Sequence, residues 1–132
     1  MKTSVRFLIG LLALTVLAVF ATSKLMAQDP VKVGAHVYKK LFENERVRML
    51  EVTFQPGDTI AMHSHPDHIA YVVSGGKLSV WEKGGKPQEV ELKAGSPLWF
   101  NAVTHAAKNV GTTPVKLAVV ELKEKPMMKG KK

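Results

Sequence analysis

From Val33 onward, short apolar and β-branched runs follow one another along the chain, with turn residues between them. The runs cover residues 47–54, 59–64, 68–73, 77–82, 97–100, 104–109 and 115–122. Strands interrupted by turn residues roughly every 8–12 positions are typical of an all-β sandwich or barrel. After residue 30 no helical period is long enough to compete with this pattern. The chain is therefore predicted to be all-β.

The strand pattern also predicts how the chain is divided. Gly75-Gly76 separates two of the runs and predicts a tight hairpin there, because paired glycines supply the positive φ that primed turns require. Neither an internal repeat nor a linker interrupts the strand region. A chain of 132 residues suffices for one domain, which is predicted to cover residues 28–122.

The N-terminal residues have a different character from the strand region. Lys2 and Arg6 precede a largely apolar run over residues 7–20, and small or polar residues follow it. This order predicts a secretory signal peptide over residues 1–27, whose cleavage site the sequence leaves open. At ~1.5 Å per residue the run spans roughly 21 Å, less than the ~30 Å hydrocarbon core. An uncleaved membrane anchor is the alternative. The mature protein is expected to be periplasmic or secreted, without a stable membrane anchor.

Composition and charge narrow the possible functions. Cysteine is absent, which excludes disulfides, thiolate metal sites and a cysteine nucleophile. The formal net charge is +8, and removal of Lys2, Arg6 and Lys24 with the leader would leave 8 − 3 = +5. Much of this excess lies in a lysine-rich tail over residues 123–132. Nucleic-acid binding is not expected, because basic residues interleaved with aromatics on a folded face are missing from this tail.

Four histidines are the candidate site. His63, His65 and His68 fall within six residues, and His105 follows about 40 positions later. Residues two apart on a strand point to the same face, so His63 and His65 can reach one metal ion. Pro66 is expected to end that strand, and a tight corner then lets His68 open the next one nearby.

The spacing of these histidines and of the glycines around them resembles the two sequence motifs of the cupin superfamily. The first motif corresponds to Gly57, His63, His65, His68 and Gly75, and the second to Gly95, residues 96–100, His105 and Asn109. Together they span residues 57–109, about half of the expected mature domain. The resemblance implies a cupin-type jelly-roll β-barrel that holds one metal ion with its histidines.

His68 stands where cupins usually have a metal-binding glutamate, and the loop before it is shorter than usual. His68 either replaces the carboxylate as a fourth ligand, or points away and leaves three histidine ligands. Imidazole ligands favour one divalent transition metal ion (Fe, Ni, Cu, Zn or Mn) over Mg²⁺ or Ca²⁺. Because imidazole binds metal only when unprotonated, affinity is expected to fall as the pH drops toward about 6.5 and below.

Further residues are expected around the metal. Asn109, four positions after His105 on the same strand face, is a candidate hydrogen-bond donor behind the ligands. The candidate pocket residues are Phe54, Trp81, Trp99 and Phe100, each of which also suits an ordinary core position. Tyr71 is expected on the face opposite to His68, and Asp67 is expected to cap the corner before it.

Two functions are compatible with such a site. By resemblance, the protein is a metal-dependent enzyme of the dioxygenase, isomerase or lyase type, acting on a small organic substrate. No residue identifies itself as a catalytic acid or base. The alternative is a non-catalytic module in which the metal stabilises the barrel and a small molecule is bound. A homodimer is expected, since a domain this small has a limited core.

Overall fold

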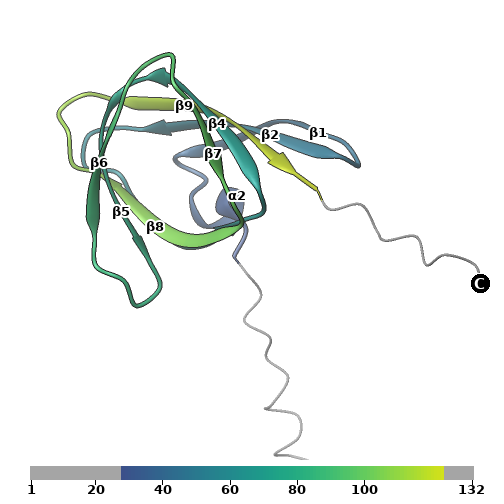
Figure 1. The fold of residues 1–132 in the computed structure, drawn as a ribbon, viewed down its shortest axis with the longest axis horizontal. Helices are drawn as coiled ribbons and strands as arrows, with labels where there is room; N and C mark the ends of the chain where they lie inside the picture. The colour runs from purple at the N-terminus through teal and green to yellow at the C-terminus, as the bar shows by residue number, and fades with distance from the viewer. Residues whose placement is uncertain (1–27, 124–132) are drawn as a thin grey trace, which may run out of the picture.

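In the computed structural model, which describes residues 28–123, two antiparallel sheets face each other and enclose a barrel (Figure 1). Strand order is β1-β2-β9-β4-β7 in the first sheet and β3-β8-β5-β6 in the second. The elements are α2 (Pro30–Val33), β1 (Tyr38–Glu43), β2 (Val47–Phe54), β3 (Thr59–His65), β4 (His68–Ser74), β5 (Gly76–Glu82), β6 (Gln88–Leu92), β7 (Pro97–Phe100), β8 (Val103–Asn109) and β9 (Val115–Leu122). The all-β prediction is confirmed.

Two predicted segments lie outside the described residues. The predicted signal peptide covers residues 1–27, and all of the basic tail except Lys123 follows the last described position. Within residues 28–123, no helix is both long enough and apolar enough to span a membrane.

The core forms where apolar residues alternate along the strands of the first sheet. In β2, Leu50, Val52 and Phe54 point inward, and Val115 and Val119 do the same in β9. Each of these side chains is at most 4% exposed. Full burial of an aliphatic or aromatic side chain contributes roughly 1.5–3 kcal/mol, so these alternating positions stabilise the barrel.

An irregularity in β3 decides which way its histidines point. Ile60 and His63 are both fully buried, although residues three apart on a regular strand face opposite sides. The pairing of β3 with β8 shifts register between these two residues, as in a β-bulge. The shift lets Ile60 remain in the core while His63 and His65 also turn inward.

The prediction of a tight hairpin at Gly75-Gly76 is wrong. β4 pairs with β9 and β7, whereas β5 pairs with β8 and β6, so the chain passes from one sheet to the other at this point. A Cβ atom on Gly75 would collide with the carbonyl oxygen of Leu92. Close approach of two backbones, and not a primed turn, therefore requires glycine at position 75.

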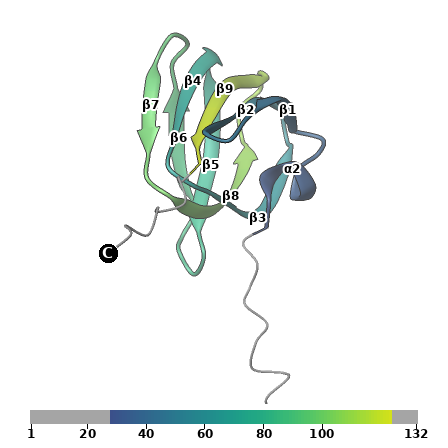
Figure 2. The same ribbon diagram turned by 90° about the vertical axis from the view of Figure 1, so that its right-hand side faces the viewer.

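A short N-terminal segment packs against β1 and β3 at one side of the barrel (Figure 2). Asp29 caps α2 by accepting a hydrogen bond from the Val31 N–H at 2.8 Å, and Pro30 supplies the fixed φ of the first turn. The backbone N–H of Ser64 donates to the carbonyl of Gln28 at 3.0 Å. The segment of residues 28–37 thereby places Tyr38, the first residue of β1, in the interior beside β3.

Candidate metal centre

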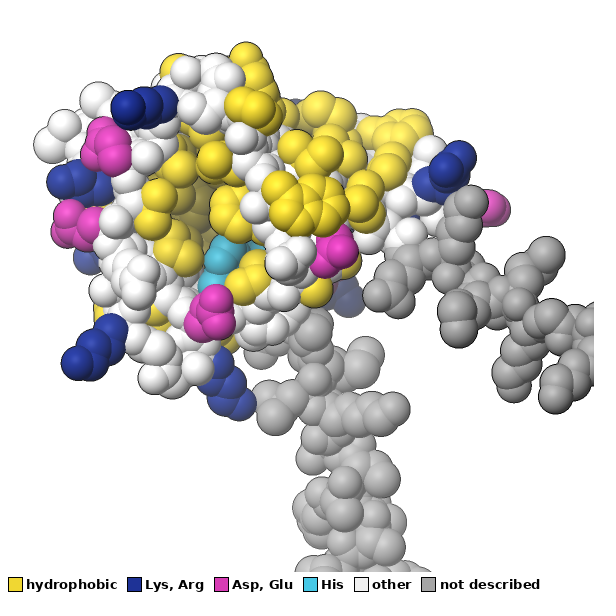
Figure 3. All heavy atoms as spheres, in the orientation of Figure 1, with side chains coloured by type: hydrophobic (Ala, Val, Ile, Leu, Met, Phe, Trp, Pro, Cys, Tyr) yellow, Lys and Arg dark blue, Asp and Glu magenta, His cyan; other side chains and the backbone are white. Residues whose placement is uncertain are grey.

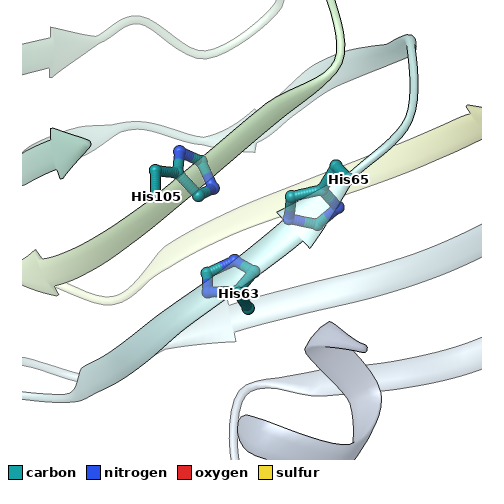
Figure 4. A group of neighbouring side chains, drawn as sticks. All are labelled: His63, His65 and His105. Atoms are coloured by element: carbon teal, nitrogen blue, oxygen red, sulfur yellow. The ribbon is translucent and has the colours of Figure 1, made fainter. Parts of the chain in front are cut away.

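Three histidines from two neighbouring strands converge inside the barrel. His63 and His65 lie on β3, and His105 lies on β8 directly opposite His63 (Figure 4). One nitrogen from each ring lies within 4.8 Å of the others. No charged residue belongs to this group, which therefore offers three neutral nitrogen donors.

Hydrogen bonds determine which nitrogen of each β3 histidine faces the site. The Nδ1–H of His63 donates to the carbonyl oxygen of Ala61 at 2.8 Å. Nδ1 of His65 lies 2.6 Å from a carboxylate oxygen of Glu121, which accepts its hydrogen. Since Nδ1 carries the hydrogen in both rings, Nε2 keeps its lone pair in both. The Nε2 atoms are the nitrogens available to a metal.

Their surroundings keep the rings of His63 and His105 uncharged. Burial lowers the pKa of His63 to about 4, although its hydrogen bond to Ala61 opposes the shift. Burial, with the neighbouring histidines adding to it, lowers the pKa of His105 to about 3. Both rings are therefore neutral near pH 7, which is the protonation state that a metal ligand needs.

A buried carboxylate supports His65 from behind. Glu121 on β9 is 1% exposed and accepts from His65 through Oε1 and from the Arg48 guanidinium through Oε2, at 2.5 Å. Burial alone would raise the pKa of Glu121, but these two hydrogen bonds outweigh it and lower the pKa. Arg48 also donates to Asp29 at 2.6 Å, which ties the cap of α2 to the site.

Tyr38 is a second residue of the site that the sequence analysis missed. Its hydroxyl lies 3.2 Å from Nε2 of His63 and 3.2 Å from Nε2 of His65. Burial, with the charge of Glu121 adding to it, raises the pKa of the phenol above its ordinary range. No motif singles out Tyr38, whereas Glu121 could have been noticed as the one acidic residue among the inward positions of β9.

His68 lies next to the three-histidine group but is not a member of it. Its ring lies 4.8 Å from that of His65 between centroids and stacks on Phe100 at 5.0 Å. The Nδ1–H of His68 donates to the carbonyl of Pro66 at 2.8 Å, so Nε2 keeps its lone pair. Burial lowers the pKa of this ring too. His68 thus lines the cavity beside the three-histidine group.

A cavity of about 160 Å³ opens over the histidines. His65, His68, His105 and Tyr38 contribute to its wall, and the other lining side chains are apolar. Figure 3 shows its mouth as a hollow walled by hydrophobic side chains, with a histidine visible at its floor. This arrangement suits a small, largely apolar molecule that presents a polar group to the histidines.

Strand alternation separates the residues expected in the pocket into those that line the cavity and those that lie on the outer face. Phe54 and Phe100 line the cavity. Trp99 does not, because it follows Leu98 and precedes Phe100, both of which face inward, and it is 54% exposed on the outer face. Trp81 likewise follows the inward Val80 and pairs with Ala106 on the outside. These two tryptophans were wrongly expected in the pocket.

The side chains of Asn109 and Asp67 form hydrogen bonds with backbone groups. The Asn109 side chain donates to the carbonyls of Phe54 and Thr113 and accepts from the Gly111 N–H, so its hydrogen bonds go to the backbone. Asp67 accepts from the Ala102 N–H at 2.7 Å, and Tyr71 is 48% exposed on the face opposite to His68.

The family follows from comparison with known proteins. A family model described as a cupin domain matches residues 50–121, more than half of the chain. The chain belongs to the cupin family. The matched region contains all four clustered histidines and Glu121, whereas Tyr38 precedes it.

Solved cupin structures agree on the fold. A cupin domain from Bordetella pertussis Tohama I is 24% identical, with a TM-score of 0.62 over 67% of this chain and 93% of that chain. An RmlC-like cupin from Methanocaldococcus jannaschii is 17% identical, with a TM-score of 0.54 over 66% and 79%. The polyketide cyclase RemF from Streptomyces resistomycificus is 21% identical, with a TM-score of 0.50 over 67% and 66%. At such identities these likenesses establish the fold alone, and no curated protein matches the chain.

The residues of this cupin fit a metal ion. Among the described residues, Nε2 of His105 is the one buried side-chain polar atom without a hydrogen-bond partner. One ring nitrogen of His105 also lies within 4.8 Å of a nitrogen of each β3 histidine. A buried polar group without a partner costs about 1–3 kcal/mol, which coordination to a metal would remove. Imidazole nitrogens suit transition metal ions.

Proposed function

We propose that this cupin binds one divalent transition metal ion through Nε2 of His63, His65 and His105, and acts as an enzyme on a small organic substrate. The observation that carries the proposal is the convergence of three imidazoles, two buried and one half-buried, beneath an apolar cavity. The ion is Fe, Ni, Cu, Zn or Mn, since imidazole donors suit all of them to different degrees.

The metal would supply Lewis-acid or redox chemistry at a coordinated polar group of the substrate. The apolar walls would exclude water and orient the rest of the molecule. His68 lines the cavity with Nε2 unprotonated, and its lowered pKa keeps it neutral at pH 7. A neutral imidazole beside the substrate can accept a proton, which favours the isomerase and lyase types over a dioxygenase.

Metal analysis of the purified protein tests this function. One equivalent of a transition metal is expected in the wild type and none above background in His63→Ala. His36→Ala is the matched control, because it removes an exposed histidine that lies outside the group. Loss of metal in neither variant, or no metal in the wild type after reconstitution, would refute the proposed site.

A non-catalytic binding module is the second candidate function. It is favoured by the lining of the cavity, which contains no aspartate or glutamate among its described residues. Glu121, the nearest buried carboxylate, is already engaged by His65 and Arg48. Small acids, sugars and diketones that raise the melting temperature without being converted would favour this module. Turnover that is lost in His105→Ala would favour the enzyme.

Export and self-association complete the proposal. The character of residues 1–27 supports export to the periplasm or beyond the cell, and the mature N-terminus would identify the cleavage site.

A second copy of the chain is the proposed partner for the outer face of the five-stranded sheet. Five apolar residues lie side by side across all its strands, namely Phe42, Met49, Val120, Ile69 and Trp99. Phe42, Ile69 and Trp99 are exposed, and Met49 and Val120 between them are partly buried. Exposed apolar patches mark interaction sites.

A further inference from the structure

We propose that the phenolic oxygen of Tyr38 is a fourth protein ligand of the metal ion, beside His63, His65 and His105. This inference rests on the metal site of the proposed function and adds an oxygen donor from outside the histidine motifs. Tyr38 is the first residue of β1, is 7% exposed, and contributes to the wall of the cavity.

The distances around Tyr38 are those between neighbouring ligands of one metal ion. Two donors that each lie ~2.1 Å from a metal are separated by about 3.0 Å in octahedral geometry and about 3.4 Å in tetrahedral geometry. The Tyr38 oxygen lies 3.2 Å from Nε2 of both His63 and His65. Both distances from the Tyr38 oxygen therefore match the spacing of neighbouring ligands.

Hydrogen counting gives an independent argument. In the neutral form that metal binding requires, His63 and His65 carry the ring hydrogen on Nδ1, so both Nε2 atoms are acceptors. Tyr38 has one hydroxyl hydrogen and can donate to only one of them. The other contact brings two lone pairs together inside the protein, while Nε2 of His105 has no partner at all. A cation at the centre would satisfy all four atoms.

The backbone holds Tyr38 at this place. Its N–H donates to the carbonyl of Gly34 at 2.7 Å, and Tyr38 pairs with Val52 of β2. A Cβ atom on Gly34 would lie 3.2 Å from Cδ2 of the Tyr38 ring and 2.9 Å from Cδ1 of Ile60. Glycine at position 34 thus leaves room for the tyrosine ring against the core. Backbone pairing and packing thus hold Tyr38 in place at the site.

Coordination to the metal ion would remove the proton of the Tyr38 phenol. The O–H bond breaks, the proton leaves to solvent, and the electron pair that remains on oxygen binds the metal ion. A divalent ion with one phenolate and three neutral imidazoles carries a net charge of +1. No oxidant, reductant or other reactant is required.

Cu(II) is the probe for this ligand, because imidazole sites bind it most tightly among the divalent first-row ions. A phenolate bound to Cu(II) gives a visible charge-transfer band with tyrosinate modes in the resonance Raman spectrum. The protein contains two tyrosines, so Tyr71→Phe is the matched control for Tyr38→Phe. Tyr71 lies on the outer face and is 48% exposed.

The wild type and Tyr71→Phe are expected to show the band with one equivalent of Cu(II). Tyr38→Phe should bind Cu(II) without the band, at least about tenfold more weakly. A band that persists in Tyr38→Phe, or a copper-loaded wild type without one, would overturn the tyrosine ligand and leave the histidine site standing. Failure of the wild type to bind Cu(II) would overturn both.

Discussion

Nδ1 of His65 lies 2.6 Å from the carboxylate of Glu121, and both residues are at most 5% exposed. The two residues are 56 positions apart and belong to different sheets. The carboxylate accepts the Nδ1 hydrogen, so the lone pair of Nε2 faces the metal site. Glu121 itself is held by Arg48, which also reaches Asp29 at the start of α2. We therefore propose Glu121 as the residue that positions His65 for metal binding.

Replacement of this carboxylate tests that role. Glu121→Gln keeps the shape but removes the charge that fixes the hydrogen on Nδ1, and is expected to weaken metal affinity by roughly 10–100-fold. Affinity would be measured by competition with a coloured chelator. Glu51→Gln, which removes a half-buried carboxylate on the outer face of the same sheet, is the control. Equal affinity in both variants would contradict the positioning role.

The histidines are predicted to differ in their contribution to metal binding. His63→Ala and His105→Ala are expected to lose the metal, since each removes one of three converging nitrogens. His68→Ala is expected to keep one equivalent, because His68 lies outside that group. If His68 is the proton acceptor, the same variant loses turnover while its metal content, measured by elemental analysis, stays unchanged. Loss of the metal in His68→Ala would instead make it a fourth ligand.

Stability of the metal-free protein should depend on pH through the buried histidines. The pKa values of His63 and His105 are lowered on folding, so the unfolded chain takes up protons first as the pH falls. Stability is thus present above about pH 6.5 and is lost as the pH falls toward the folded pKa of about 4 for His63. His63 alone should cost about 2 kcal/mol at pH 5 relative to pH 7.5, and His105 adds to this.

Urea unfolding at the two pH values measures this loss. The metal-loaded protein should lose less, because coordinated nitrogens cannot be protonated without releasing the metal. The same lowered pKa values move the expected fall in metal affinity from about pH 6.5 to lower pH. Equal stability of the metal-free protein at pH 7.5 and pH 5 would show that these rings are charged or exposed.

Asn109 should matter for folding and not for the metal. Asn109→Ala removes three hydrogen bonds to the backbone around the β8–β9 turn and leaves buried polar groups without partners. The expected loss is about 1–3 kcal/mol in the free energy of unfolding. Metal content of the folded variant should equal that of the wild type. A variant of normal stability that binds metal weakly would restore Asn109 as a residue that supports the ligands.

The outer face of the five-stranded sheet is predicted to hold two copies together. Trp99→Glu places a charge at the end of the apolar row, where like charges would meet or lie unpaired across the interface. A shift from dimer to monomer is expected in light scattering at fixed protein concentration. Lys83→Glu, an exposed change outside this sheet, should leave the dimer intact. A wild-type monomer would rule out this partner.

The all-β fold, the cupin motifs and the four histidines could be predicted from the order of the amino acids. Period-two alternation is a local property, and it correctly placed His63 with His65 on one face and Tyr71 opposite His68. The same rule could have shown that Trp99 and Phe100, as neighbours on one strand, do not both face the cavity.

The surroundings of those histidines depend on contacts between strands that are far apart in the chain. The register shift between Ile60 and His63 depends on pairing with β8, and the passage at Gly75 depends on contact with Leu92. Tyr38 lies 25 positions before His63 in the sequence, and Glu121 lies 56 positions after His65. Such contacts between distant segments are set by how the two sheets close around the core, which the pattern within a single strand does not encode.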